Sequence, residues 1–208
     1  MYLGKKSPQH MQIDLEYKGV LPSAQNGKDH RSAEKQEIRL IFSGQLKRKW
    51  RDSPQLSQWD GASFPIATRG GWHYESPDSS VPFFRVQTCG FDAVPLVSWH
   101  NGLECKLAIT IVGDTRSASA VIGDGDVDNR LKVLFDALRI PHEPKEVPGN
   151  MFGNGAERMY CLLEDDSLIQ KFSVEAVQSP CSPAEHVVRL RVTVQQMDGT
   201  HDALAGFR

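Results

Sequence analysis

Hydrophobic and polar residues alternate along four stretches of the chain. These stretches are residues 11–18, 103–111, 171–176 and 188–195. A period of two places successive side chains on opposite faces of a strand, so each stretch predicts a strand with one apolar and one polar face. A shorter apolar run at residues 158–163 predicts one more strand.

Two other stretches have apolar residues at the period of an amphipathic helix. The first covers residues 32–51, with Ser32 as its expected N-cap. Its expected buried side chains are Ile38, Ile41, Phe42 and Leu46. The second helix follows Asp128, its expected N-cap, and ends before Pro141. Its apolar positions recur at i, i+3, i+4 and i+7, and they are Leu131, Leu134, Phe135 and Leu138.

Residues 53–81 show no sustained period and are rich in Ser, Gly, Pro and Trp. The glycine pair at 70–71 is typical of a turn, and we expect an irregular segment around it. Residues 82–98 are apolar enough for one or two short strands. Gly90 and Pro95 are expected to break these strands.

Two tryptophans of the irregular segment, Trp59 and Trp72, have two interpretations. An indole ring can stack on nucleobases, which would make these residues part of a nucleic-acid interface. A tryptophan in a long loop more often fixes that loop to the core, because its large ring buries much apolar surface. The structural interpretation is therefore the more common one.

The chain length is typical of one domain. A chain of 208 residues buries a sizeable core, and we expect a single domain over residues 1–208, with residues 53–100 as an insertion and 197–208 as a flexible tail. Hydrophobic residues at 39% and charged residues at 24% are typical of globular proteins. No apolar run approaches the roughly 20 residues of a membrane span. The expected compartment is the cytoplasm, with no membrane partner.

Cysteine spacing and net charge exclude several classes of protein. Cys89, Cys105, Cys161 and Cys181 never approach a C-x-x-C spacing, so neither a zinc ribbon nor a redox motif is indicated. Reduced, mostly buried thiols are expected. The net charge of −2 does not favour nucleic-acid binding by the whole surface. A polyanion would have to bind a local basic patch.

The helix predicted over residues 32–51 offers such a patch. Its basic residues are Lys35, Arg39, Lys47, Arg48, Lys49 and Arg51. Lysine and arginine can solvate an exposed helix face without binding anything, or they can contact phosphates. The four residues Lys47, Arg48, Lys49 and Arg51 are the candidate DNA-binding residues.

An acidic segment precedes the second predicted helix. Asp126 and Asp128 are two residues apart, so in an extended backbone their carboxylates leave the same face and can share a cation. The positive end of the helix favours negative charge there. Lys132 follows Asp128 by four residues, which brings its ammonium one helical turn away.

Two structural alternatives compete with a catalytic role for this segment. A calcium loop of the EF-hand type is excluded, because Asn129 stands where the loop needs Gly and Phe135 where it needs a bidentate Glu. The simpler alternative is a capped helix whose preceding acidic residues are merely solvated. This alternative is favoured for an isolated pair of aspartates, because short motifs are weak evidence. A second acidic cluster at residues 164–167, next to a predicted strand, weakens that alternative.

These motifs together resemble the RusA family of Holliday junction resolvases. The resemblance rests on Asp126, Asp128, Asn129 and Lys132 as a D-x-D-N-x-x-K motif, followed by D-A-L at 136–138 and by Asp165 and Asp166. It covers residues 104–177. It implies a fold that mixes helices and strands, α/β in the broad sense and α+β in detail. In this fold a small mixed β-sheet packs with two main helices, and we expect an irregular segment to be inserted in this chain.

The resemblance also implies roles for these residues. Asp126, Asp128 and Asp166 would bind Mg²⁺, or alternatively Mn²⁺, and Lys132 would be the catalytic lysine. Asn129 would orient a carboxylate or phosphate, and Asp165 would support the metal ligands from outside. Carboxylates suit Mg²⁺, which prefers oxygen ligands and retains several waters. Asp136, four residues after Lys132, is expected to pair with it.

The implied function is a magnesium-dependent, structure-selective endonuclease that hydrolyses phosphodiesters of branched DNA as a homodimer. The chain is longer than the family pattern, has an extended loop after the second helix and is not basic overall. This charge leaves the preferred DNA structure open, because phosphate contacts dominate DNA affinity. The alternatives are a non-catalytic nucleic-acid-binding protein with the same fold, and a module in which a divalent ion serves stability alone.

Overall fold

The computed structural model describes most of the chain. The described residues are 10–23, 31–54, 56–60, 63–78, 80–113, 127–148, 158–178 and 186–198. Most of the predicted tail, together with Cys181 and Asp126, lies outside these ranges. Within them, no helix is long and apolar enough to cross a membrane.

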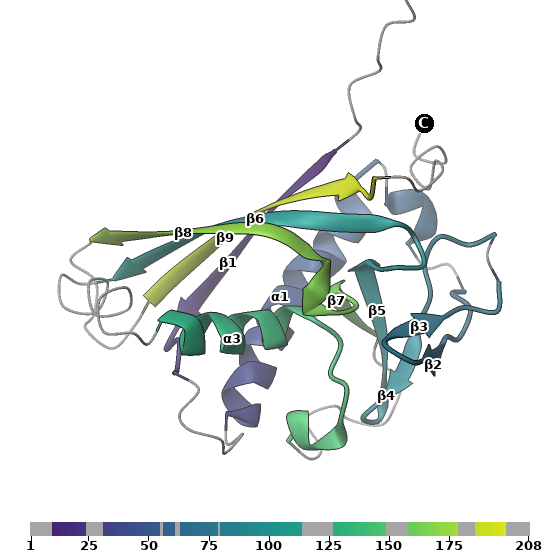
Figure 1. Ribbon diagram of the computed structural model, residues 1–208, viewed down its shortest axis with the longest axis horizontal. Coiled ribbons are helices and arrows are strands. Elements are labelled where there is room, and N and C mark those ends of the chain that lie inside the picture. The colour runs from purple at the N-terminus through teal and green to yellow at the C-terminus, as the bar shows by residue number, and fades with distance from the viewer. Residues whose placement is uncertain are drawn as a thin grey trace, which may run out of the picture.

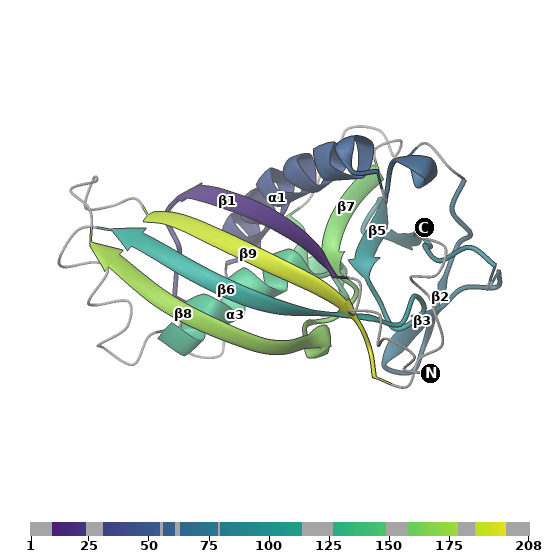
Figure 2. The same ribbon diagram turned by 90° about the horizontal axis from the view of Figure 1, so that it is seen from above.

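The four alternating stretches form one sheet, as Figure 2 shows. Its strands are β1 (Met11–Gly19), β6 (Leu103–Gly113), β8 (Ile169–Gln178) and β9 (His186–Gln196), in the order β1-β9-β6-β8. Strand β9 pairs antiparallel with β1 and β6, whereas β6 and β8 are parallel. The predicted strands and the mixed sheet are therefore confirmed.

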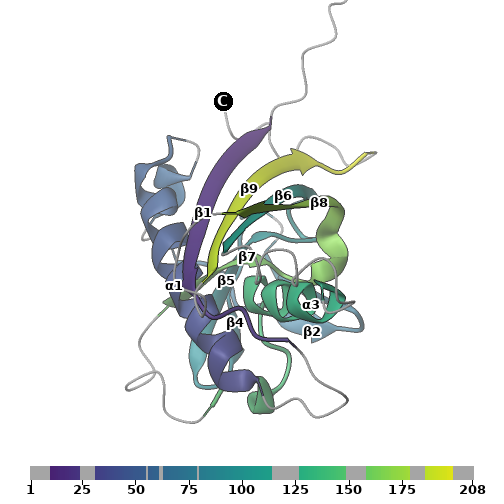
Figure 3. The same cartoon turned by 90° about the vertical axis from the view of Figure 1, so that its left-hand side faces the viewer.

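Both predicted helices cover the same face of this sheet (Figures 1 and 3). They are α1 (Ser32–Asp52) and α3 (Val127–Leu138). Side chains from both helices and from the strands share one apolar core, which includes Ile38, Leu134 and Ile109. A sheet with one face on helices and the other toward solvent explains the period of two in the sequence. The fold is mixed α+β with two main helices.

The two helices begin differently from what the sequence predicts. Ser32 is the first helical residue of α1, and Arg31 occupies the N-cap without a capping side-chain hydrogen bond. Asp128 lies inside the first turn of α3, because the helix already begins at Val127. The predicted caps are therefore wrong by one or two residues, yet the carboxylate of Asp128 still lies at the positive end of its helix.

A second sheet lies beside the first one and has the order β4-β5-β7. Its strands are β4 (Val86–Thr88), β5 (Phe91–Val97) and β7 (Arg158–Leu163), and β5 is parallel to β7. Gly90 separates β4 from β5, as predicted, but β5 continues through Pro95. The pairing of β5 with β4 ends at Ala93, so in the described structure Pro95 pairs with β7 alone. A proline is tolerated there because its missing N–H can face the unpaired side.

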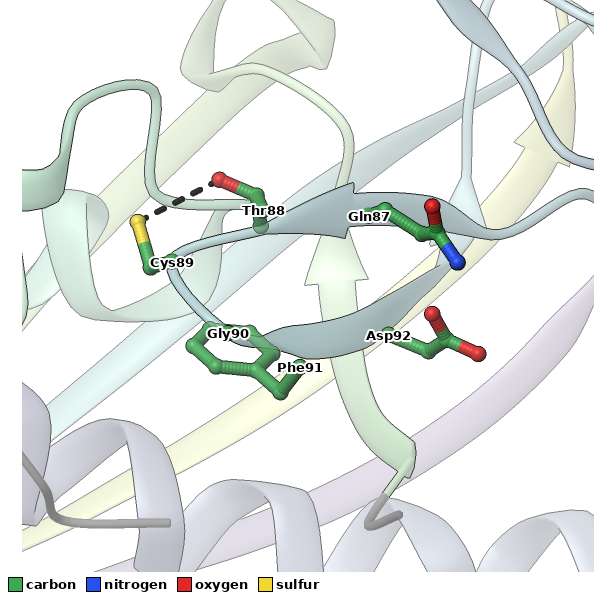
Figure 4. A pocket seen from close by; sticks show the side chains of 6 residues that line it. All are labelled: Gln87, Thr88, Cys89, Gly90, Phe91 and Asp92. Carbon is green, nitrogen blue, oxygen red and sulfur yellow. Dashed lines mark hydrogen bonds between the residues drawn. The ribbon is translucent and has the colours of Figure 1, made fainter. Parts of the chain in front are cut away.

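The turn between β4 and β5 consists of Cys89 and Gly90, with φ of 51° and 86°. Positive φ at both central residues is typical of the type I′ turn that suits a two-residue hairpin. Figure 4 shows this turn, where the hydroxyl of Thr88 lies 3.3 Å from the sulfur of Cys89. The same hydroxyl donates to the carbonyl of Pro141 at 3.2 Å, which ties the hairpin to the segment after α3.

The predicted irregular segment contains a short 3-10 helix η1 (Ser57–Trp59) and a hairpin of β2 (Thr68–Gly70) and β3 (His73–Glu75). The hairpin forms at the glycine pair that indicated a turn. The segment also contributes to the main core through Leu56 and Phe64, and Phe83 just after it belongs to the same core. Residues 53–100 are thus part of the folded body rather than an appendage to it.

Trp59 and Trp72 differ in their environment. The ring of Trp59 packs edge to face on Phe83, with the ring centroids 6.0 Å apart. It therefore fixes its segment to the core, as the structural interpretation predicts. Trp72, in contrast, is 93% exposed, so its ring buries almost no apolar surface.

The described cysteines fit the expectation of reduced thiols. Cys89, Cys105 and Cys161 are free, and the latter two are buried. Burial raises the pKa of the Cys105 and Cys161 thiols to about 12. Both groups are thus protonated near neutral pH, which makes them inert core residues.

Candidate active site

The exposed face of α3 carries the first group of predicted site residues. Asp128, Asn129 and Lys132 are all exposed, and Asp126 lies outside the described residues. Asp128, Lys132 and Asp136 follow one another at intervals of four residues, so they form one stripe along the helix, which is exposed at Asp128 and Lys132 and buried at Asp136. This α3 stripe spans about 12 Å from Asp128 to Asp136 at the rise of an α-helix.

The second group of predicted residues stands between β7 and β8. Asp165 caps the short 3-10 helix η4 (Asp166–Leu168), because its carboxylate accepts hydrogen bonds from the backbone N–H and the hydroxyl of Ser167. Burial by itself raises the pKa of the Asp165 carboxyl. The bonds from Ser167 and the charges of His142 and Arg139 outweigh burial and hold that pKa below its usual value.

Asp166 has the opposite electrostatic environment. Burial and the negative charge of Asp165 raise the pKa of the Asp166 carboxyl above its usual value, and Asp136 adds to this effect. The positive charge of Arg139 opposes the shift without cancelling it. A carboxylate that is crowded by like charge is stabilised by a cation, because the cation relieves the repulsion.

Asp136 does not take the predicted place beside Lys132. Its carboxylate lies 2.9 Å from the ammonium of Lys35 on α1 and 3.0 Å from the guanidinium of Arg139. The side chain of Arg39 donates to the backbone carbonyl of Asp136 at 2.7 Å. Asp136 therefore joins α3 to α1 inside the protein.

Two residues of the predicted basic patch belong to this buried network. Lys35 is 4% exposed and Arg39 is 1% exposed, so neither reaches DNA. A buried cation needs negative charge nearby, and Asp136 and Glu146 supply it. The sequence-based assignment of Lys35 and Arg39 to an exposed basic face is wrong.

The four candidate DNA-binding residues remain at the surface. Lys47, Arg48, Lys49 and Arg51 are exposed in the last turns of α1. Arg51 lies 2.8 Å from Asp52, which neutralises part of its charge. Cations at the C-terminal end of a helix also interact favourably with its dipole, so these residues have a structural role beside any contact with phosphate.

The segment after α3 adds charged groups that the sequence pattern did not indicate. Arg139 lies 3.1 Å from Glu146, and His142 lies 3.6 Å from Asp165. Burial and the charge of Arg139 lower the pKa of the His142 imidazole. In the sequence Arg139 stands at the end of the second predicted helix, and His142 and Glu146 stand in the proline-rich stretch after it. Their charge was the one feature that distinguished them.

Glu164 connects the β2–β3 hairpin to the acidic cluster. The backbone N–H of Tyr74 on β3 donates to Oε1 of Glu164 at 2.6 Å, and that of Trp99 donates to Oε2 at 2.9 Å. Burial raises the pKa of the Glu164 carboxyl, although both hydrogen bonds oppose the shift. One side chain next to Asp165 thus holds two separate segments in place.

The structure brings some predicted residues together and leaves others apart. Asp166 lies within electrostatic range of Asp136 and Arg139, at the C-terminal end of α3, and Asp165 lies within range of Arg139. Asp128 belongs to the other end of the same helix. In the described part of the chain, no group of three His, Cys, Asp or Glu side chains could hold a metal ion. Because Asp126 lies outside that part, the complete predicted ligand set is not assembled there.

The donor chemistry still suits Mg²⁺. The acidic side chains near η4 and along α3 offer carboxylate oxygens, which is the ligand type that Mg²⁺ prefers. A pocket of about 320 Å³ at the tip of the β4–β5 hairpin is lined by residues 87–92 and includes none of the predicted site residues. That pocket is therefore not the candidate site.

Comparison with family models, with curated proteins and with solved structures finds no match to this chain.

Proposed function

We propose that the protein is a magnesium-dependent, structure-selective endonuclease that acts on branched DNA. The observation that supports this most is the pair of adjacent carboxylates at η4, Asp165 and the exposed Asp166, where burial and the negative charge of Asp165 raise the pKa of the Asp166 carboxyl. The raised pKa means that the charged form of Asp166 is disfavoured, and a bound cation would relieve this. The D-x-D-N-x-x-K motif around the start of the α3 stripe supplies the resemblance to RusA resolvases.

The acidic and basic residues have distinct proposed roles. By the resemblance, Asp126, Asp128 and Asp166 would hold Mg²⁺, with Mn²⁺ as the alternative ion. Because Asp128 and Asp166 lie toward opposite ends of α3, one ion would contact both only if binding of metal or DNA draws them together. The ion would supply a polarised water and neutralise charge on the phosphate. Lys132 is exposed one turn from Asp128, so its ammonium can orient a phosphate oxygen. Asn129 and Asp165 would orient the groups around them through hydrogen bonds.

A non-catalytic DNA-binding protein is the second candidate function. It is favoured by the four exposed cations at the end of α1, which can contact phosphates without any reaction. Melting with and without Mg²⁺, set beside nicking of branched DNA, separates the candidates. Nicking that requires Mg²⁺ supports the enzyme. A higher melting temperature in Mg²⁺ without nicking supports a structural ion, and DNA binding without either effect supports the second candidate.

We predict that Lys47, Arg48 and Lys49 contact DNA phosphates. Replacing all three with Gln should weaken binding to every sequence tested and flatten the salt dependence of affinity by up to about three units. The measurement is binding by fluorescence anisotropy over a range of salt concentrations. An unchanged slope would mean that these residues only solvate the end of α1.

We also predict a homodimer in solution. Symmetric cleavage of a four-way junction needs two equivalent active sites, and a two-fold dimer supplies them. Light scattering at micromolar concentration should therefore give twice the mass of the chain. A monomeric mass would contradict the resolvase form of the proposal and leave a nuclease that cuts a single branch.

A further inference from the structure

Trp72 is the most exposed large apolar side chain in the described part of the chain, at 93%. It stands at the tip of the β2–β3 hairpin, where Gly70 pairs with His73 and leaves Gly71 and Trp72 as the two turn residues. Gly71 has a φ of 62°, and a glycine at the first turn position is typical of type II′ hairpins. The turn therefore presents the indole to solvent rather than to the core.

The hairpin is fixed to the candidate active site. Tyr74 follows Trp72 by two residues, and its N–H donates to the buried carboxylate of Glu164 at 2.6 Å. Glu164 directly precedes Asp165 and Asp166 in the sequence. A hydrogen bond between an amide and a carboxylate is a strong contact, so the position of the hairpin follows that of the acidic cluster.

The charges of the hairpin also reach the candidate site. Arg69 on β2 lies within electrostatic range of His142, whose pKa is lowered mainly by burial and Arg139, and its effect is smaller than the opposing effects of Glu146 and Asp165. His142 in turn lies 3.6 Å from Asp165. Arg69 and the exposed Trp72 therefore lie on one hairpin beside the acidic cluster, an aromatic ring together with a guanidinium.

We propose that Trp72 stacks on an unpaired or splayed nucleobase next to the phosphate that the acidic site cleaves, and so selects branched over linear DNA. This inference rests on the proposed nuclease function. A solvent-exposed indole on a fixed hairpin offers a preformed face for a base, and stacking tolerates any base sequence. In linear duplex both faces of each base are already covered, whereas a branch point exposes them. Arg69 adds positive charge for the adjoining phosphates.

The test compares the wild-type protein with Trp72→Ala and Trp72→Phe on a four-way junction and on linear duplex of the same sequence. Trp72→Ala should weaken junction binding by about tenfold or more, the usual effect of removing one stacked ring. Its affinity for linear duplex should stay unchanged. Trp72→Phe keeps an aromatic face and should retain most of the junction affinity. Quenching of tryptophan emission by a single-stranded oligonucleotide should be smaller in Trp72→Phe than in the wild type.

The control is Trp99→Phe, because Trp99 is 45% exposed and its backbone N–H binds the same Glu164. This variant should bind junctions like the wild type. Equal junction affinity of Trp72→Ala and wild type would overturn the stacking role and leave the nuclease proposal intact. An equal loss on junction and duplex would also overturn it, since the ring would then make a general contact. A wild-type protein that binds no DNA would overturn both proposals.

Discussion

Replacing Asp166 with Asn should abolish nicking of branched DNA and leave the protein folded. Asn preserves the shape of the side chain but removes a charge that the proposed ion needs. The nicking rate should fall by more than about 100-fold, because mutating a residue that only supports a metal ligand already lowers activity or metal affinity by about 10- to 100-fold. Burial and Asp165 raise the pKa of the Asp166 carboxyl, so its charged form is disfavoured in the folded state. Stability near neutral pH should therefore stay equal or rise slightly.

Binding of the Asp166→Asn variant to branched DNA should stay equal or become slightly tighter, because a negative charge near the phosphates is removed. Asp126→Asn and Asp128→Asn should behave in the same way. Asp60→Asn is the matched control, since Asp60 is exposed beside η1, and it should change neither nicking nor binding. Wild-type nicking by both Asp166→Asn and Asp128→Asn would show that the acidic residues only serve the ends of helices.

Replacing Asp136 with Ala should destabilise the protein by about 3–5 kcal/mol, because it removes the carboxylate that the buried ammonium of Lys35 contacts. Arg139 loses a contact of 3.0 Å at the same time. For a chain of this length the change corresponds to a fall in melting temperature of about 10 °C. Denaturant unfolding monitored by circular dichroism gives the free energy directly.

The control for this prediction is the double variant Lys35→Met and Asp136→Leu, which removes the Lys35–Asp136 ion pair and leaves Arg139 paired with Glu146. It should recover much of the lost stability, since an apolar pair of similar size often replaces a buried ion pair without loss. An effect of Asp136→Ala below about 1 kcal/mol would contradict a structural role for the buried network. Asp136 would then have to be reconsidered as part of the active site.

The main sheet and both helices were predictable from sequence because one face of each element is buried. A period of two in residues 11–18 or 188–195 follows directly from a sheet with helices on one side only. Elements with two buried faces have no such period. Strand β5 is an example, since it is buried along almost its whole length and contains Pro95.

The burial of Lys35 and Arg39 was not predicted from the sequence, because lysine and arginine are usually exposed and both residues were assigned to the surface on that ground. Their positions in α1 did carry a sign of burial. Lys35 and Arg39 continue the spacing of Phe42 and Leu46, so they lie on the same buried stripe of the helix. Their partner Asp136 lies 97 residues from Arg39, and no local pattern connects residues so far apart.

The candidate site was predictable in its parts but not in its arrangement. The motif indicated Asp128, Lys132 and Asp166, and the structure places them along α3 and near its C-terminal end. The contributions of Arg139 and His142 depend on how the chain after α3 returns to η4. The β2–β3 hairpin is bound to the site through Glu164, which the sequence presented only as one more acidic residue.

Cleavage of four-way junction, flap and linear duplex substrates in parallel, with Mg²⁺ and with EDTA, tests the central proposal most directly. Denaturing gels of end-labelled strands give the rate and the position of each cut. The proposal predicts Mg²⁺-dependent nicking of at least one branched substrate at sites near the branch point, and much slower nicking of linear duplex. No cleavage of any branched substrate in Mg²⁺ or Mn²⁺ by protein that is folded would contradict it.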